Sequence, residues 1–195
     1  MVFSGMGKLT PLGRGATYRD LCEVPPEFVA EIIDGDLWVS PRPALPHAHA
    51  GARLIAELTP PFDHGRDGPG GWWILYEPEL HFGDDVLVPD LAGWRRDRLS
   101  RDVGSRPFMT LFPDWACEIL SPSSRRLDRG KKLRVYARAG VRFIWLVDPI
   151  ARTLEAMQLV EGKWAPLVTL VDAAPVRVEP FDAIEFPLSR IWLDL

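Results

Sequence analysis

"WACEILSPSSRRLDRGKKLRVYARAGVRFIWLVDP", residues 115–149, is the stretch that decides the fold class. It reads as a strand, a turn, a helix and a second strand. A helix that crosses between two strands, in a chain whose other elements are mostly strands, is typical of an α/β or α+β protein with a mixed central β-sheet flanked by helices. Such crossovers bring strand ends and helix termini together, and functional sites tend to form there.

The helix predicted over residues 124–139 carries two charges on its apolar side. Val135, Tyr136 and Ala139 form an apolar stripe at helical spacing. Three or four residues back along that stripe lies Lys132, followed by Asp128. We therefore expect a lysine and an aspartate to point into the protein, where each needs a partner.

The flanking sequence predicts mostly strands. A short helix is expected after Thr17 and a longer one over residues 47–58, with a hairpin turn at Asp34-Gly35 between two strand-like runs. Strands are predicted over 72–82 and 86–94, and a further strand pair over 142–149 and 153–160. With 195 residues the chain is long enough for one domain, which we expect to span 1–195.

Composition indicates a cytoplasmic protein. Cys22 and Cys117 lie far apart and indicate no disulfide framework, which fits a reducing compartment. No apolar run reaches the roughly 18 residues that a membrane span requires, so no membrane association is expected. Four scattered histidines and two cysteines make a structural zinc site an unfavoured interpretation.

The charge is unevenly distributed along the chain. The formal net charge is −4, yet residues 125–142 contain eight basic residues and one acidic residue, a local charge of +7. Clustered arginine on one element of an acidic protein is what a phosphate-binding face would look like. The nucleic-acid-binding candidates are Arg125, Arg126, Arg129 and Lys131, with Arg134 beside them. The alternative is a solvated helix face.

Two carboxylates stand where apolar residues are expected. Asp90 follows Pro89 in an otherwise apolar run, and Glu118 lies in the middle of "WACEIL". Neighbouring acids of this kind bind a hard divalent cation such as Mg²⁺, and a lysine beside them can position a water and stabilise charge on a phosphate. A buried structural salt bridge between Lys132 and one of the acids is the alternative.

In order and separation, several of these pieces resemble the Uma-type family of putative restriction endonucleases, within the PD-(D/E)XK phosphodiesterase superfamily. They are "EIIDGDLWVSP", "VPDLAGW", "CEILSPSS", a lysine in the following helix, "YARAGV" and "FIWLVDP". The resemblance covers residues 17–165, a nuclease-like core, and leaves 166–195 as a C-terminal β-rich extension. It implies a restriction-endonuclease-like fold, a Mg²⁺-dependent site in which Mn²⁺ could substitute, and phosphodiester cleavage in nucleic acid, with DNA favoured.

The resemblance also implies roles for four residues. Asp90 matches the aspartate of the "PD" element and Glu118 the acid of the second strand, so both would be catalytic metal ligands. Lys132 matches the family's catalytic helix lysine, and Glu31 resembles the family's first acid. The superfamily's usual lysine stands two residues after the strand acid, where this chain has Leu120. Lys132 would supply that ammonium group from the neighbouring helix.

Three further candidates have two interpretations each. Glu31 is either a ligand of a metal or water, or an exposed alternate position of its strand. His47 lies on the apolar side of its helix and is either a site residue or a satisfied core histidine. Glu79, on the same face of its predicted strand as Glu77, either lines the cleft or pairs across the surface.

The residues thus favour a Mg²⁺-dependent endonuclease that hydrolyses phosphodiester bonds. The alternative is a nucleic-acid or protein interaction module that keeps the same scaffold without turnover. The expected partner is nucleic acid, and a homodimer is compatible with cutting both strands. A glycosidase with two carboxylates gains little support from the basic helix.

Overall fold

The computed structural model describes residues 10–100 and 103–194, and it confirms the predicted mixed α+β class with a mixed central sheet. The central sheet has six strands in the order β11-β10-β9-β8-β7-β4. β8 and β9 pair in parallel, whereas the other neighbours pair antiparallel. The strands are β4 (Trp72–Tyr76), β7 (Leu91–Arg95), β8 (Trp115–Ile119), β9 (Phe143–Asp148), β10 (Thr153–Val160) and β11 (Lys163–Val171).

The crossover between β8 and β9 is helical, as the sequence predicts, but it is not a regular α-helix. It consists of α3 (Arg125–Leu127), a π-helical turn η4 (Asp128–Lys132) and α4 (Leu133–Ala139). Gly140 ends the segment in the left-handed conformation, with φ 78°. The π turn contains both inward charges of the sequence prediction, Asp128 and Lys132, and both are buried.

A second sheet of five strands has the order β1-β3-β2-β6-β5. Its strands are β1 (Thr10–Arg14), β2 (Phe28–Ile33), β3 (Asp36–Pro41), β5 (Leu80–Phe82) and β6 (Asp85–Leu87). β2 and β3 form the predicted hairpin. Asp34 and Gly35 both have positive φ, 53° and 77°, as a type I′ turn requires.

The strand predictions for 72–82 and 86–94 are wrong in one respect. Each run contains two strands rather than one, and the two belong to different sheets. β4 joins the central sheet and β5 the second sheet, with the chain bending at Glu77, where φ is 45°. The second run bends between β6 and β7, so Asp90 lies in that bend and not inside a strand. A continuous apolar pattern does not show where a strand leaves one sheet for another.

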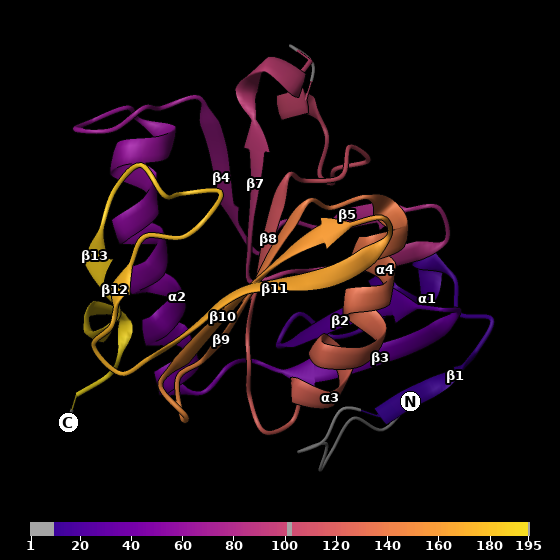
Figure 1. Cartoon of the computed structure of the whole chain (residues 1–195). Coiled ribbons are helices and arrows are strands. Elements are labelled where there is room, and N and C mark those ends of the chain that lie inside the picture. Colours follow the sequence, from indigo (N-terminus) through magenta and orange to yellow (C-terminus); the bar gives the residue numbers. More distant parts are fainter. Residues whose placement is uncertain (1–9, 101–102, 195) are drawn as a thin grey trace.

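The two faces of the central sheet are covered by different elements (Figure 1). One face packs on α2 (Leu45–Leu58), on the π-helical turn η1 (Thr59–Asp63) and on the C-terminal segment. The other face packs on the α3–α4 segment and on the five-stranded sheet. Trp115, Trp145 and Phe181 meet edge to face in the first core, and Tyr136 lies in the second.

The remaining elements are short. α1 (Tyr18–Cys22) begins at the predicted threonine cap, where Thr17 and Asp20 form a capping box. The 3-10 turns η2 (Arg96–Arg98) and η3 (Val103–Ser105) follow β7. After β11 come β12 (Pro175–Val176), β13 (Phe186–Pro187) and η5 (Leu188–Ile191). Residue 165 lies inside β11, and the division into a core and an extension stays a prediction.

Neither cysteine is in a disulfide: Cys117 is buried and Cys22 exposed. Among the helices of the described residues, none combines the length and the apolar character needed to cross a membrane. Both observations concern residues 10–100 and 103–194.

Candidate active site

A cleft of about 390 Å³ opens where three connections of the fold meet. These are the connection from β3 to α2, the bend between β6 and β7, and the loop from β8 to α3, and the ends of β2 and β4 border it as well. Three predicted catalytic residues, Asp90, Glu118 and Lys132, all line this cleft, as does Glu31. The fold therefore brings together residues that are up to about a hundred positions apart in sequence.

Glu118 faces the cleft because of the alternation of β8. Its neighbours on the same face, Ala116 and Leu120, belong to the core under the α3–α4 segment, whereas Cys117 and Ile119 face α2. Glu118 is 2% exposed. Burial raises the pKa of the Glu118 carboxyl well above its usual value; Lys132 opposes the rise, and the nearby carboxylates add to it.

Lys132 supplies the positive charge at the centre of the site. Its Nζ lies 2.8 Å from Glu118 Oε1, 2.9 Å from Glu31 Oε1 and 3.7 Å from Asp128 Oδ1. Burial lowers the pKa of the Lys132 amine, but the three carboxylates outweigh burial and hold that pKa well above the usual value. The amine is therefore a fixed ammonium group that joins β2 to β8.

The π turn places Asp128 in the same charged group. Asp128 is 2% exposed, and burial raises its pKa from 3.8 to about 7, against the attraction of Lys132 and a hydrogen bond with Ser124. π-helical turns recur at functional sites because the wider turn re-aims side chains that a regular α-helix would direct elsewhere. Asp128 is therefore partly protonated near neutral pH.

Asp90 is held by hydrogen bonds on both carboxylate oxygens. Oδ2 accepts the Ile119 backbone N–H at 2.6 Å, and Oδ1 lies 3.2 Å from Nε2 of His47. Its main-chain carbonyl accepts the N–H of Glu77 at 3.0 Å. These contacts tie the bend before β7 to β8, to α2 and to the end of β4.

The imidazole of His47 lines the cleft and contacts Asp90, and its role as a site residue stays a prediction. Burial lowers the pKa of His47, but the hydrogen bond and the charge of Asp90 have the larger combined effect. The pKa of His47 is therefore raised above its usual value. Its Nδ1 atom is buried without a hydrogen-bond partner among the described residues.

Glu31 is buried, so the alternative of an exposed strand position does not hold. Its Oε1 accepts the Val88 N–H at 2.8 Å and thereby anchors the bend that carries Asp90. Glu79 does not line the cleft; its Oε1 accepts a hydrogen bond from the Tyr18 hydroxyl and contacts His81. Glu77 does line the cleft and pairs with Arg42.

Tyr136 is a buried partner of Glu118 that the sequence did not single out. Its hydroxyl donates a short hydrogen bond to Glu118 Oε1, from a fully buried ring. In the sequence it counts as one member of an apolar stripe. The available signal was its position four residues after Lys132, on the same side of the helix.

The charges of the cleft do not balance. Its lining contains five carboxyl groups, Glu31, Glu77, Asp90, Glu118 and Asp128, and two permanently basic groups, Arg42 and Lys132. Buried carboxylates in excess need protons or a cation, and their hard oxygen atoms suit Mg²⁺ in ligand type and charge. Within residues 10–100 and 103–194, however, no three His, Cys, Asp or Glu side chains are positioned to share one metal ion. Lys132 lies between Glu31 and Glu118 instead.

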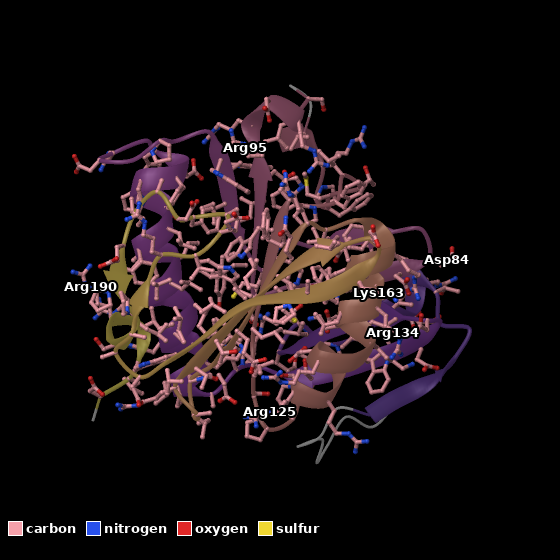
Figure 2. The ribbon with its side chains drawn as sticks, viewed as in Figure 1. Asp84, Arg95, Arg125, Arg134, Lys163 and Arg190 are labelled. Atoms are coloured by element: carbon pink, nitrogen blue, oxygen red, sulfur yellow. The ribbon has the colours of Figure 1, made fainter. Side chains whose placement is uncertain are left out.

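Most of the basic residues between 125 and 142 have acidic partners within the chain. The pairs are Arg125 with Asp148, Arg129 with Glu155, Lys131 with Asp36, Arg134 with Asp34, and Arg138 with Asp34 and Asp85. Figure 2 shows Arg125 at the start of α3 and Arg134 on α4. Arg126 is exposed and has no ion pair with a described residue. In the folded protein, acidic residues from other parts of the chain thus neutralise most of the positive charge of residues 125–142.

Comparison with known proteins gives a family and a fold. The crystal structure of a putative nuclease belonging to DUF820, from Anabaena variabilis, is similar with a TM-score of 0.72 and 22% identity, over 91% of this chain and 97% of that one. At this identity the likeness shows the fold. No protein with a curated description matches significantly. The model of the Uma2 family, described as "Putative restriction endonuclease", matches residues 16–189, and the chain belongs to that family.

Proposed function

We propose that this protein is a metal-dependent endonuclease that hydrolyses phosphodiester bonds in nucleic acid, with DNA as the favoured substrate. One observation carries the proposal: Asp90, Glu118 and Lys132 line a single cleft together with Glu31. The description of the family supports the same reaction class.

Asp90 and Glu118 would hold the metal, Mg²⁺ or its substitute Mn²⁺. Such an ion supplies Lewis-acid activation of the phosphate and lowers the pKa of a water. Asp90 is already oriented for this role, since the Ile119 N–H and His47 fix its two oxygens. Glu118 is oriented by Tyr136 and Lys132.

Lys132 would stabilise the negative charge that develops on the phosphate during hydrolysis. Its ammonium group is fixed in a site of low exposure, where a charge acts more strongly than in water. Glu31 holds the ammonium from the opposite side and keeps the Val88 backbone in place. Glu31 is therefore a positioning residue for both Lys132 and the bend that carries Asp90.

The basic segment would contribute phosphate contacts mainly through Arg126. A carboxylate of the chain already pairs with each of Arg125, Arg129 and Lys131. Each of them would have to leave that carboxylate before it could bind a phosphate. Arg126 needs no such exchange and is exposed. The same proposal includes a homodimer and a cytoplasmic location.

A second function is favoured by one observation. The Lys132 ammonium contacts Glu31 and Glu118 within 3 Å, as it would in a purely structural ion-pair network. An interaction module on this scaffold would keep such a network without turnover. The two functions differ in turnover: a nuclease cuts nucleic acid and loses this activity with Asp90, whereas an interaction module does not cut.

The test is a cleavage assay on single- and double-stranded DNA and RNA with Mg²⁺ or Mn²⁺. Wild type should cut at least one substrate, and Asp90→Asn should abolish cutting while the variant still folds. Asp84→Asn, an exposed aspartate outside the cleft, is the matched control and should cut normally. Cleavage by Asp90→Asn at the wild-type rate, or no cleavage by any purified wild type, would contradict the proposal.

A further inference from the structure

An exposed aromatic ring directly precedes a residue of the cleft lining in the sequence. Tyr76 is the last residue of β4 and is 44% exposed. The next residue, Glu77, lines the cleft and forms an ion pair with Arg42, which lines it too. Tyr76 and Arg42 are called the Tyr76 rim below.

The Tyr76 rim is built rigidly. A β-carbon placed on Gly51 of α2 would lie 3.4 Å from Cε2 of Tyr76, so the ring packs directly on α2. Glu77 adopts a left-handed φ of 45° that non-glycine residues rarely take, and its N–H donates to the Asp90 carbonyl. The strained turn therefore joins the ring to the bend that carries the proposed metal ligand.

Tyr76 stays a neutral phenol at physiological pH. Burial first, and then the charges of Glu77 and Asp90, raise its pKa to about 12. A neutral, electron-rich ring that is partly open to solvent is suited to stacking against a flat partner.

Arg42 keeps free hydrogen-bond donors. Its guanidinium donates to Glu77 Oε2 at 3.4 Å and to the Pro26 carbonyl at 2.9 Å, which fixes its position. A guanidinium group has five N–H donors, so others are available to a ligand. Its geometry matches the oxygens of a phosphate.

We propose that the Tyr76 rim binds the nucleotide next to the phosphate being cleaved: the base stacks on Tyr76, and Arg42 contacts a flanking phosphate. This inference rests on the proposed function and specifies its substrate, a nucleic-acid strand with an unpaired base at that position. A base inside a duplex has both faces covered by its neighbours, whereas an unpaired base offers a face to an aromatic side chain.

The proposal favours a base over an apolar peptide as the occupant. The rim adjoins Asp90 and a cleft lined by five carboxyl groups, so a phosphate there needs a counter-charge, which a bound cation and the Arg42 guanidinium would supply. Every base presents a flat π-face, so stacking needs no sequence specificity. A peptide side chain would use neither Arg42 nor the neighbouring reaction centre.

The experiment measures binding in the Asp90→Asn background, so that no strand is cut. Fluorescence anisotropy follows a labelled ten-nucleotide dT strand and an abasic strand with the same phosphates. Tyr76→Ala should weaken binding of the dT strand by about 5- to 150-fold, the range that stacking on one aromatic side chain gives. Binding of the abasic strand should change less than about twofold, because it has no base to stack.

Two variants separate stacking from damage to the fold. Tyr76→Phe keeps the ring and should restore binding of the dT strand. Tyr18→Ala removes a tyrosine of similar exposure, 41%, whose hydroxyl donates to Glu79 outside the cleft, and it should leave binding unchanged. Thermal melts check that each variant is folded.

The outcomes distinguish this inference from the proposed function. If the Asp90→Asn protein binds the strands and Tyr76→Ala binds both as tightly as Tyr18→Ala does, the stacking inference is wrong and the nuclease proposal stands. If Tyr76→Ala weakens the dT and abasic strands equally, the base is not the ligand. If wild type neither binds nor cuts any nucleic acid, both proposals fail.

Discussion

Replacing Lys132 by methionine should destabilise the protein strongly at alkaline pH. The side chain is 3% exposed, and its ammonium group is the partner of Glu31, Glu118 and Asp128. Methionine fills a similar volume without the charge, so three buried carboxyl groups lose their common cation. Breaking a buried ion pair by removing one partner costs about 3–5 kcal/mol. For a chain of this length that corresponds to a fall in Tm of about 6–20 °C.

The loss should shrink as the pH falls. In the folded variant the three carboxyl groups can be neutralised only by protons, whereas in the unfolded chain they ionise near pH 4. The folded variant therefore binds more protons than the unfolded chain above pH 4, and its stability falls as pH rises. Denaturant unfolding at pH 5.5 and pH 8 should show a clearly larger difference from wild type at pH 8.

Lys131→Met is the matched control, because it removes the adjacent lysine. The Lys131 side chain is 29% exposed and pairs with Asp36 at 2.9 Å, a partly solvated contact. Such pairs contribute about 0–1 kcal/mol. Equal melting of the two variants at pH 8, or a Lys132→Met loss that does not depend on pH, would refute the reasoning that Lys132 is the counter-ion of a buried acid cluster.

Three further predictions concern Asp128, the metal ion and the basic segment. The pKa of Asp128 is raised from 3.8 to about 7 in the folded protein, so the folded state holds this proton more tightly than the unfolded chain does. The resulting stabilisation of about 4 kcal/mol is fully present below pH 4 and is lost as pH rises through 7. Asp128→Asn should therefore unfold at higher denaturant than wild type at pH 8 and similarly at pH 4; a lower midpoint at pH 8 would contradict it. Mg²⁺ at 100 times its Kd should stabilise wild type by about 2.7 kcal/mol in thermal melts and leave Asp90→Asn unchanged, whereas equal shifts would remove Asp90 from the metal site. Arg126→Ala should weaken nucleic-acid binding for all sequences and reduce the slope of log binding constant against log salt concentration by about 1. Arg129→Ala should have a smaller effect, because Arg129 is paired with Glu155; equal effects would show that this ion pair does not prevent Arg129 from binding phosphate.

The sequence alone was sufficient for the elements whose signals are local. The Asp34-Gly35 turn predicts its hairpin because both residues tolerate positive φ, and the structure has that hairpin. The crossover from β8 to β9 follows from the order of strand, helix and strand. Helical spacing also predicts that Lys132 points inward, since a residue's side of a helix depends only on its neighbours along the chain.

Other features depend on contacts between distant segments, and the tertiary structure decided them. The strands around Glu77 and Asp90 divide between two sheets, and the N–H of Glu77 donates to the Asp90 carbonyl where the two bends meet. Apolar alternation is the same whichever sheet a strand joins, so it could not reveal the division.

The charge of the basic segment is the clearest difference between sequence and structure. Counting residues 125–142 gives +7, yet Arg138 pairs with Asp34 and Asp85, and Lys131 pairs with Asp36. The acids come from the β2–β3 hairpin and from β6, some 50 to 100 positions earlier in the chain. Charges act through space with a range of about 10 Å, so their balance is set by the folded arrangement and not by their order in the sequence. The sequence by itself determined which charged groups are present and which side of the helix carries Lys132, and only the tertiary structure decided which of those groups neutralise one another and which face the cleft.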